Sequence, residues 1–300
     1  MGNQQPLPAG LPSTGIGPRA SGFANPKSEI PNPKSRIPGF TLVEVLVVVA
    51  IIALLVAILL PTLTAARAEV RRIACEANLK QLHVAWTTYL DMFKGFFPGG
   101  MNLEYNYGGL QGEGSQFFGN NPDMPVPKPL NRCLNMPLVV RTGGEVFRCP
   151  DDAGTPFVRP SARRYYGTSY FPNHLLVGRN IWVLPGKPCE AVWIELAGDP
   201  WAWPVRPGML ENLNRAKVDN AAQLVLIGDY AWLDNWDDSV PDVFPFWHRR
   251  KRTHNIAFMD GYGEYVRIRK GIHVDARYSI VPFKRIREAM TQCQQEIKCP

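Results

Sequence analysis

The sequence predicts an α+β protein in which one long N-terminal α-helix packs on a mainly antiparallel β-sheet with long loops. An unbroken apolar run predicts the start of the helix, an amphipathic segment continues it, and short apolar segments between Gly- and Pro-rich stretches predict the sheet. The predicted parts are a disordered leader (1–39), a transmembrane helix (40–61), its amphipathic continuation (62–98) and a globular β-rich domain (99–300).

The leader and the net charge exclude little by themselves. Residues 1–38 are rich in Pro and Gly, a composition that buries too little apolar surface to fold alone. The chain of 300 residues carries a formal net charge of +7, and part of that charge lies in the leader. The remaining charge is mild, so we do not expect a nucleic-acid partner.

The apolar run from Phe40 to Leu60 contains only two polar side chains, Thr41 and Glu44. A helix of about 20 residues spans roughly 30 Å, which is the thickness of the hydrocarbon core of a bilayer. The run therefore predicts one membrane-spanning helix. A carboxylate at such a depth is costly unless it is paired, and this makes Glu44 a functional candidate.

Two simpler interpretations of this run remain open. One is a secretory signal peptide that is cleaved near Ala66–Ala68, although the long run, its acid and its long leader argue against it. The other is a plain single-span anchor in which Glu44 is incidental.

The residues Gly39, Phe40, Thr41, Leu42 and Glu44 follow a basic stretch and together resemble the prepilin signature of type IV pilins and type II secretion pseudopilins. The resemblance implies cleavage after Gly39 by a membrane prepilin peptidase and N-methylation of Phe40. It also implies that Glu44 pairs with the terminal amine of a neighbouring subunit in a fibre. Such pairing agrees with the high cost of an unpaired buried carboxylate.

The same resemblance implies a location and partners. The N-terminus would be cytoplasmic, the single span would lie in the inner membrane, and the C-terminal domain would be periplasmic or, in a fibre, extracellular. The partners would be the prepilin peptidase and other pilin or pseudopilin subunits, in a homopolymer or a heteropolymer.

Beyond the apolar run, the sequence predicts a kink at Pro61 and then one apolar helix face. The predicted face consists of Cys75, Leu79, Leu82, Trp86, Leu90 and Phe93. We expect this face to pack on the sheet, with Trp86 and Tyr89 in the core rather than in a ligand site. Gly95 and Pro98–Gly100 should end the helix.

Further segments extend the resemblance to large-domain pseudopilin-like proteins. These are residues 75–82 with the exit Phe96–Gly99, residues 147–152, and the turn Asp260–Gly261. The turn resembles the C-terminal hairpin of prepilin-processing-associated proteins, in which a His, nine residues and Asp-Gly recur. In this chain Arg250 occupies the position of that His.

The domain after residue 99 begins with a long loop up to residue 132 and then contains several predicted strands. The predicted elements are a hairpin over Leu138–Val140 and Glu145–Cys149, strands at Tyr165–Tyr170, Ile181–Leu184, Ala191–Leu196 and Leu224–Asp229, a hairpin over Asn255–Met259 and Tyr262–Ile268, and a helix over residues 282–297. Asp260 and Gly261 form the tight turn of the last hairpin and have a structural role in this interpretation.

No cofactor is predicted, although some acidic residues are weak candidates for calcium. The candidates are Asp151, Asp152, Asp234, Asp237 and Asp238. Their spacing does not match an EF-hand loop, and solvated turn carboxylates are the simpler interpretation. We expect Trp201, Trp203 and Trp232 to cover one sheet face, with a binding platform as the alternative. The basic run His248–His254 is expected to be a solvated loop, with phosphate binding as its alternative.

The sequence contains no Cys-x-x-Cys pair, so neither a zinc site nor a thioredoxin-type site is predicted. The cysteines are Cys75, Cys133, Cys149, Cys189, Cys293 and Cys299. Cys293 could pair with Cys299 and Cys133 with Cys149, whereas Cys75 is interpreted as a small apolar residue of the helix. The connectivity stays open.

The function predicted from these observations is that of a structural fibre subunit. The alternative is a membrane-anchored cell-surface module that binds polysaccharide or DNA. An enzyme is not predicted, because the five His residues form no recognisable catalytic or metal-ligand spacing. The choice between a pilus and a secretion pseudopilus stays open.

Overall fold

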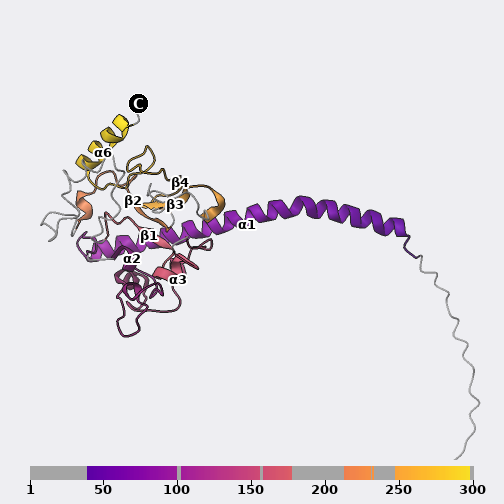
Figure 1. Cartoon of the computed structure of the whole chain (residues 1–300), viewed down its shortest axis with the longest axis horizontal. Helices are drawn as coiled ribbons and strands as arrows, with labels where there is room; N and C mark the ends of the chain where they lie inside the picture. Colours follow the sequence, from indigo (N-terminus) through magenta and orange to yellow (C-terminus); the bar gives the residue numbers. More distant parts are fainter. Residues whose placement is uncertain are drawn as a thin grey trace, which may run out of the picture. The chain divides into compact units, whose positions relative to one another are not determined.

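The computed structural model describes residues 39–99, 103–155, 158–177, 213–230, 232 and 247–297. The described residues divide into two units, a first one up to Leu54 and a second one from Leu55 on. Helix α1 (Leu42–Met92) begins in the first unit and ends in the second, and the labelled strands belong to the second unit (Figure 1).

The shorter helical elements all belong to the second unit. They are α2 (Leu103–Asn106), η1 (Gln116–Phe118), η2 (Pro129–Leu134), η3 (Glu145–Phe147), α3 (Ala162–Tyr166), η5 (Arg215–Lys217), η6 (Trp247–Arg249) and α6 (Lys284–Ile297). The helix that was predicted over residues 282–297 is therefore confirmed as α6.

Four short strands form one antiparallel sheet in the order β1-β2-β3-β4. Their bounds are β1 (Tyr170–Pro172), β2 (Val225–Asp229), β3 (Thr253–Phe258) and β4 (Gly263–Arg267). Tyr170 pairs with Asp229 and Thr253 with Arg267. The α+β class, the buried strand before Asp229 and the C-terminal hairpin are thereby confirmed.

The core of the second unit forms around the apolar face of α1. The buried residues of this helix are Cys75, Leu79, Leu82, Ala85, Trp86, Tyr89 and Leu90. The Trp86 ring stacks on Tyr107 with centroids 5.6 Å apart. The prediction that Trp86 and Tyr89 belong to the core is confirmed. Phe93 follows the end of the helix and is 42% exposed, so it does not extend the buried face.

Both the backbone and a side chain of α1 also bond directly to the sheet region. The side-chain amide of Asn255 in β3 donates to the carbonyl of Arg72 at 3.3 Å. The His83 Nε2 atom lies 3.3 Å from the carbonyl oxygen of Met259, next to the β3–β4 turn. These contacts place the C-terminal half of α1 along β3 and its turn.

The hairpin predicted over residues 138–149 is wrong. Residues Glu145–Phe147 form the 3₁₀ helix η3 instead, and Arg148 donates its backbone N–H to the Glu145 carbonyl at 2.9 Å. Gly143 and Gly144 adopt φ values of 82° and 63°. This left-handed pair turns the chain into a 3₁₀ helix rather than back along a strand.

The strand predicted over Tyr165–Tyr170 is also wrong, because α3 and its C-cap occupy its first half and β1 begins only at Tyr170. The Ser161 side chain caps the helix by accepting a hydrogen bond from the Arg164 N–H, and Gly167 ends the helix with φ 96°. These two caps outweigh the strand preference of the tyrosines. The predicted strands Ile181–Leu184 and Ala191–Leu196 lie outside the described residues.

Candidate functional site

Helix α1 begins beside the acidic side chain of Glu44. Its Oε2 atom accepts hydrogen bonds from the backbone N–H and from the hydroxyl of Thr41, both at 2.8 Å. The backbone N–H of Glu44 donates to the Thr41 hydroxyl at 3.2 Å. This is the reciprocal pattern of a capping box, which satisfies donors at the helix start. Glu44 therefore holds the helix start in addition to its predicted role in assembly.

The first part of α1 exposes an apolar surface. Every large apolar side chain from Phe40 to Leu60 is exposed, and the exposed fraction ranges from 43% at Val56 to 82% at Phe40. Among the described residues, α1 is the one helix whose length and composition would allow it to cross a membrane. Such a surface is stable only against lipid or other apolar helices.

The residues predicted for processing, for the kink and for the turn all lie within the described part of the chain. Gly39 and Phe40 precede the helix, and Pro61 lies inside it. Asp260 accepts a hydrogen bond from the Tyr262 N–H at 2.9 Å, and Gly261 adopts φ 96°. The roles of these residues in processing, in a helix kink and in the turn stay predictions.

The calcium candidate Asp152 already has a full set of protein partners. Its two oxygens accept hydrogen bonds from Gly154, Ala162, Arg163 and Ser169, at distances of 2.6–3.0 Å. These donors take up the lone pairs that a calcium ion would need, so Asp152 fixes the start of α3 instead.

The other calcium candidates give no support for a calcium site. Asp151 forms an ion pair with Arg71 and accepts a hydrogen bond from His248 Nδ1 at 3.0 Å. The residues Asp234, Asp237 and Asp238 lie outside the described part of the chain.

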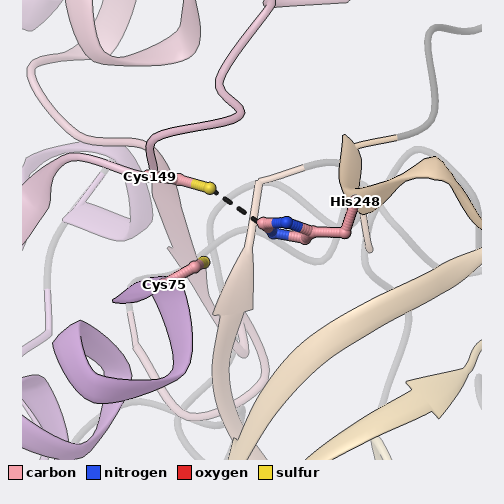
Figure 2. A group of neighbouring side chains, drawn as sticks. All are labelled: Cys75, Cys149 and His248. Atoms are coloured by element: carbon pink, nitrogen blue, oxygen red, sulfur yellow. Dashed lines mark hydrogen bonds between the residues drawn. The ribbon is translucent and has the colours of Figure 1, made fainter. Parts of the chain in front are cut away.

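A buried group that the sequence did not predict lies where α1 meets the sheet. Cys75 on α1 and Cys149, two residues after η3, direct their sulfur atoms toward the ring of His248 on η6 (Figure 2). One ligand atom from each of these three residues lies within 4.8 Å of the others, and all three are buried. The His248 Nε2 atom is 3.4 Å from the sulfur of Cys149.

A buried carboxylate adjoins the same group. Asp229 ends β2, is 0% exposed, and has its Oδ2 atom 3.7 Å from His248 Nε2. The same oxygen accepts the backbone N–H of Asn255 at 3.0 Å, and Oδ1 lies 2.5 Å from His254 Nδ1. We call Cys75, Cys149, His248 and Asp229 the buried quartet.

The ionisation of the quartet differs from that of isolated side chains. Burial raises the pKa of the Cys75 thiol, but its contacts with Cys149 and His248 outweigh burial and lower the pKa to about 7. Burial raises the pKa of Cys149 well above its ordinary value. Burial lowers the pKa of His248, but its contact with Cys75 and the nearby carboxylates raise the pKa to about 9. Cys75 and His248 thus favour a thiolate–imidazolium pair.

The sequence interpretation missed the quartet for two reasons. It relied on short spacings such as Cys-x-x-Cys, whereas these residues come from four distant segments. It also assigned the run His248–His254 to a solvated loop, and this is wrong for its two histidines, which are 6% and 1% exposed. Arg250 and Lys251, between them, are exposed as expected.

The cysteines correct a further expectation. Cys133 and Cys149 are both free, so the proposed pairing between them is wrong. Cys75 is free and buried, in agreement with its interpretation. Cys293 is disulfide-bonded, whereas Cys189 and Cys299 lie outside the described residues.

Of the three tryptophans expected to cover the sheet, one is described. Trp232 is fully buried, and its indole N–H donates to the carbonyl of Phe171 in β1 at 2.9 Å. This position agrees with a covering role. Trp201 and Trp203 lie outside the described residues.

Comparison with known proteins bears on the N-terminal part of the chain. A family model described as the prokaryotic N-terminal methylation motif matches residues 34–60. No curated protein and no solved structure matches the chain. The matched stretch includes Gly39, Phe40 and Glu44 and ends within α1.

Proposed function

We propose that this chain, whose N-terminal motif and long apolar helix fit a type IV pilin or pseudopilin, is a structural subunit of a pilus-like or pseudopilus fibre. The observation that carries the proposal is the match over residues 34–60, whose helical part from Leu42 to Leu60 exposes its apolar side chains and contains a single acid, Glu44. The helix would anchor the chain in the inner membrane through residues 40–61, with the C-terminal domain outside the cytoplasm.

The geometry before the helix supports processing after Gly39. Helix α1 begins only at Leu42, so the bond between Gly39 and Phe40 lies in non-helical chain. A peptidase requires access to both sides of the bond that it cuts, and a bond outside the helix gives that access. Methylation of Phe40 would follow on the new amine, next to a side chain that is 82% exposed.

The native N-terminus tests the processing step. Mass analysis of protein from its own cells should give a mature chain that begins at N-methylated Phe40. Recovery of a chain that retains residues 1–39, or of one that is trimmed at Ala68 and released from the membrane, would overturn the proposal.

Assembly would rest on lateral packing of the apolar helices and on one charge pair. In a membrane, apolar helices gain little from the hydrophobic effect against each other, so close packing and polar contacts provide the specificity. The carboxylate of Glu44 is the one acidic group between Phe40 and Leu60. Pairing with the amine of a neighbouring subunit would fix the axial register between helices.

Two substitutions at Glu44 separate its capping role from its charge. Glu44→Gln keeps an oxygen acceptor for Thr41, as a capping box allows, but removes the charge. Glu44→Ala removes both. We expect both variants to insert into the membrane and neither to enter fibres. Glu69→Gln, an exposed acid of the same helix, is the matched control and should assemble normally. Normal fibre incorporation of Glu44→Gln would refute the charge pair.

One surface feature favours a second candidate function, the binding of an acidic polysaccharide. A depression of about 650 Å³ is bordered mainly by basic side chains. Its lining residues are Arg252, Arg267, Ile268, Arg269, Lys270, Ile272, Asp275 and Arg277. Retention of the full-length protein on polyuronate but not on neutral dextran, with loss in an Arg267→Ala/Lys270→Ala variant, would support this function. Retention on DNA alone would refute it.

A further inference from the structure

Three ligand atoms of the buried quartet lie close enough together to bind one zinc ion, because those of Cys75, Cys149 and His248 all lie within 4.8 Å of one another. Zinc binds sulfur at about 2.3 Å and nitrogen or oxygen at about 2.0–2.2 Å, so ligand atoms at the corners lie roughly 3.3–3.8 Å apart. The His248 Nε2 atom lies 3.4 Å from the Cys149 sulfur and 3.7 Å from Asp229 Oδ2. We propose that Cys75, Cys149 and His248 bind one Zn²⁺ ion and that Asp229, whose carboxylate adjoins His248, completes the coordination shell as the fourth ligand.

The partners around the quartet hold the ligand atoms in place. Asp151 lies 3.0 Å from His248 Nδ1, so the ring can donate that N–H to the carboxylate and direct Nε2 toward the sulfur atoms. A carboxylate behind a histidine ligand is a common outer partner in zinc sites. Asp229 is held in turn by the Asn255 N–H at 3.0 Å and by His254 at 2.5 Å.

The backbone also directs His248 inward. This residue adopts φ 57° and ψ 23°, the left-handed region that few non-glycine residues occupy. The conformation lies within η6, five residues before β3 begins at Thr253, and it brings the ring to the two cysteines (Figure 2). A strained backbone that positions a chemically active side chain is typical of functional sites.

The ligand chemistry selects zinc over the other common ions. Calcium and magnesium require several oxygen ligands, and the quartet offers one carboxylate. Two thiolates with an imidazole in tetrahedral array select zinc. Cys75, Cys149 and Asp229 are at most 1% exposed and His248 is 6% exposed, so four protein ligands would close the coordination shell. The site is therefore structural rather than catalytic, because a catalytic zinc keeps one open position.

The competing arrangement is a disulfide between Cys75 and Cys149. It would use two members of the quartet and would assign no role to the buried carboxylate and ring that face each other at 3.7 Å. A zinc ion uses all four and joins α1, the segment after η3, the end of β2 and η6 at one point. The zinc site does not depend on whether the chain assembles into a fibre.

Elemental analysis of the full-length protein tests the proposal. Protein purified in detergent without chelators should contain one zinc per chain, and His248→Ala and Cys149→Ser should lose it. Cys133→Ser is the matched control, because this half-buried free thiol lies outside the quartet, and its zinc content should be unchanged. Absence of zinc together with a Cys75–Cys149 disulfide in non-reducing mass spectrometry would overturn the proposal.

Two further measurements test the site if the ligand variants fail to fold. One uses a variant of Asp151, which contacts the ligand His248, and the other replaces zinc by cobalt. Asp151→Asn should fold and should weaken zinc binding by about 10–100-fold. Co²⁺ in place of zinc should give the visible bands of a tetrahedral site and a sulfur-to-metal charge-transfer band. Chelation should lower the melting temperature by roughly 5–10 °C and expose both thiols to alkylation. Octahedral cobalt bands, or thiols that react equally with and without zinc, would refute the site.

Discussion

The N-terminal and C-terminal halves of α1 form one continuous helix but differ in the distribution of their apolar side chains. From Phe40 to Leu60 the large apolar side chains are exposed around the helix, whereas from Cys75 to Leu90 one stripe is buried and mainly polar residues occupy the other faces. A helix that is apolar on all sides needs an apolar medium, and a striped helix forms one wall of a protein core. Helicity is thus common to both halves, and the placement of apolar residues alone decides what each half contacts.

The largest expected effect comes from one substitution made in each half. Leu82 is 0% exposed and Leu59 is 62% exposed. Leu82→Ala should lower the free energy of unfolding by about 2–5 kcal/mol, because it leaves a cavity in the core. Leu59→Ala should change it by less than about 0.5 kcal/mol. Denaturant unfolding of the full-length protein in detergent measures both. Similar losses for the two variants would contradict the contrast between the halves.

Acid should destabilise the second unit through two buried histidines, His174 and His273. Burial and the nearby His273 lower the pKa of His174 to about 3, and burial lowers the pKa of His273 to about 4. Below about pH 6.5 the unfolded chain binds protons at these positions while the folded chain does not. The free energy of unfolding should therefore fall with falling pH, by up to about 1.4 kcal/mol per pH unit for each histidine.

Melting temperatures between pH 7 and pH 4 measure this effect. His174→Gln should reduce the slope, since one of the two groups no longer titrates. An unchanged slope in this variant would show that other groups dominate the acid response.

A smaller effect tests whether the β3–β4 turn packs on the striped half of α1. A Cβ atom at Gly261 would lie 2.9 Å from the ring of His83, whereas a Cβ at Gly143 meets nothing within 4 Å. Both glycines have positive φ, so Gly143→Ala should cost about 1 kcal/mol for the backbone alone. Gly261→Ala should cost about 1 kcal/mol more in thermal unfolding. Equal costs would mean that the ring moves aside freely.

The smallest effect concerns the helix start. Thr41→Val removes the hydroxyl of the capping box and should destabilise the first turn of α1 by about 0.5–1 kcal/mol. Faster hydrogen exchange at residues 42–46, with unchanged global unfolding, is the expected result. Thr62→Val is the control, because its hydroxyl only donates to a carbonyl inside the helix. Equal hydrogen exchange in the two variants would show that the Thr41 hydroxyl does not stabilise the first turn of α1.

Sequence reasoning found the elements whose signals are local. Three signals come from residues that are close in sequence: the apolar periodicity of α1, the apolar run before Asp229 and the Asp260–Gly261 pair. All three predicted elements are present. The caps Ser161 and Gly167 were also local signals, and attention to them would have predicted α3 instead of a strand.

The buried quartet could not be predicted in the same way. Periodicity placed Cys75 on the apolar face of the helix, but it does not show which residues of other segments pack against that face. Asp229 was the last residue of a predicted strand, and His248 belonged to a basic run that is typical of exposed loops. Only the pairing of β2 with β3 and the backbone turn at His248 bring these side chains together.

The capping box at the start of α1 has a consequence for the proposed maturation. Both hydrogen bonds that Glu44 receives come from Thr41 and end on Oε2, so Oε1 takes part in neither. A cut after Gly39 removes no atom of this arrangement. Maturation would then leave the geometry of the helix end unchanged and add one new cation within reach of an acid whose second oxygen is already oriented.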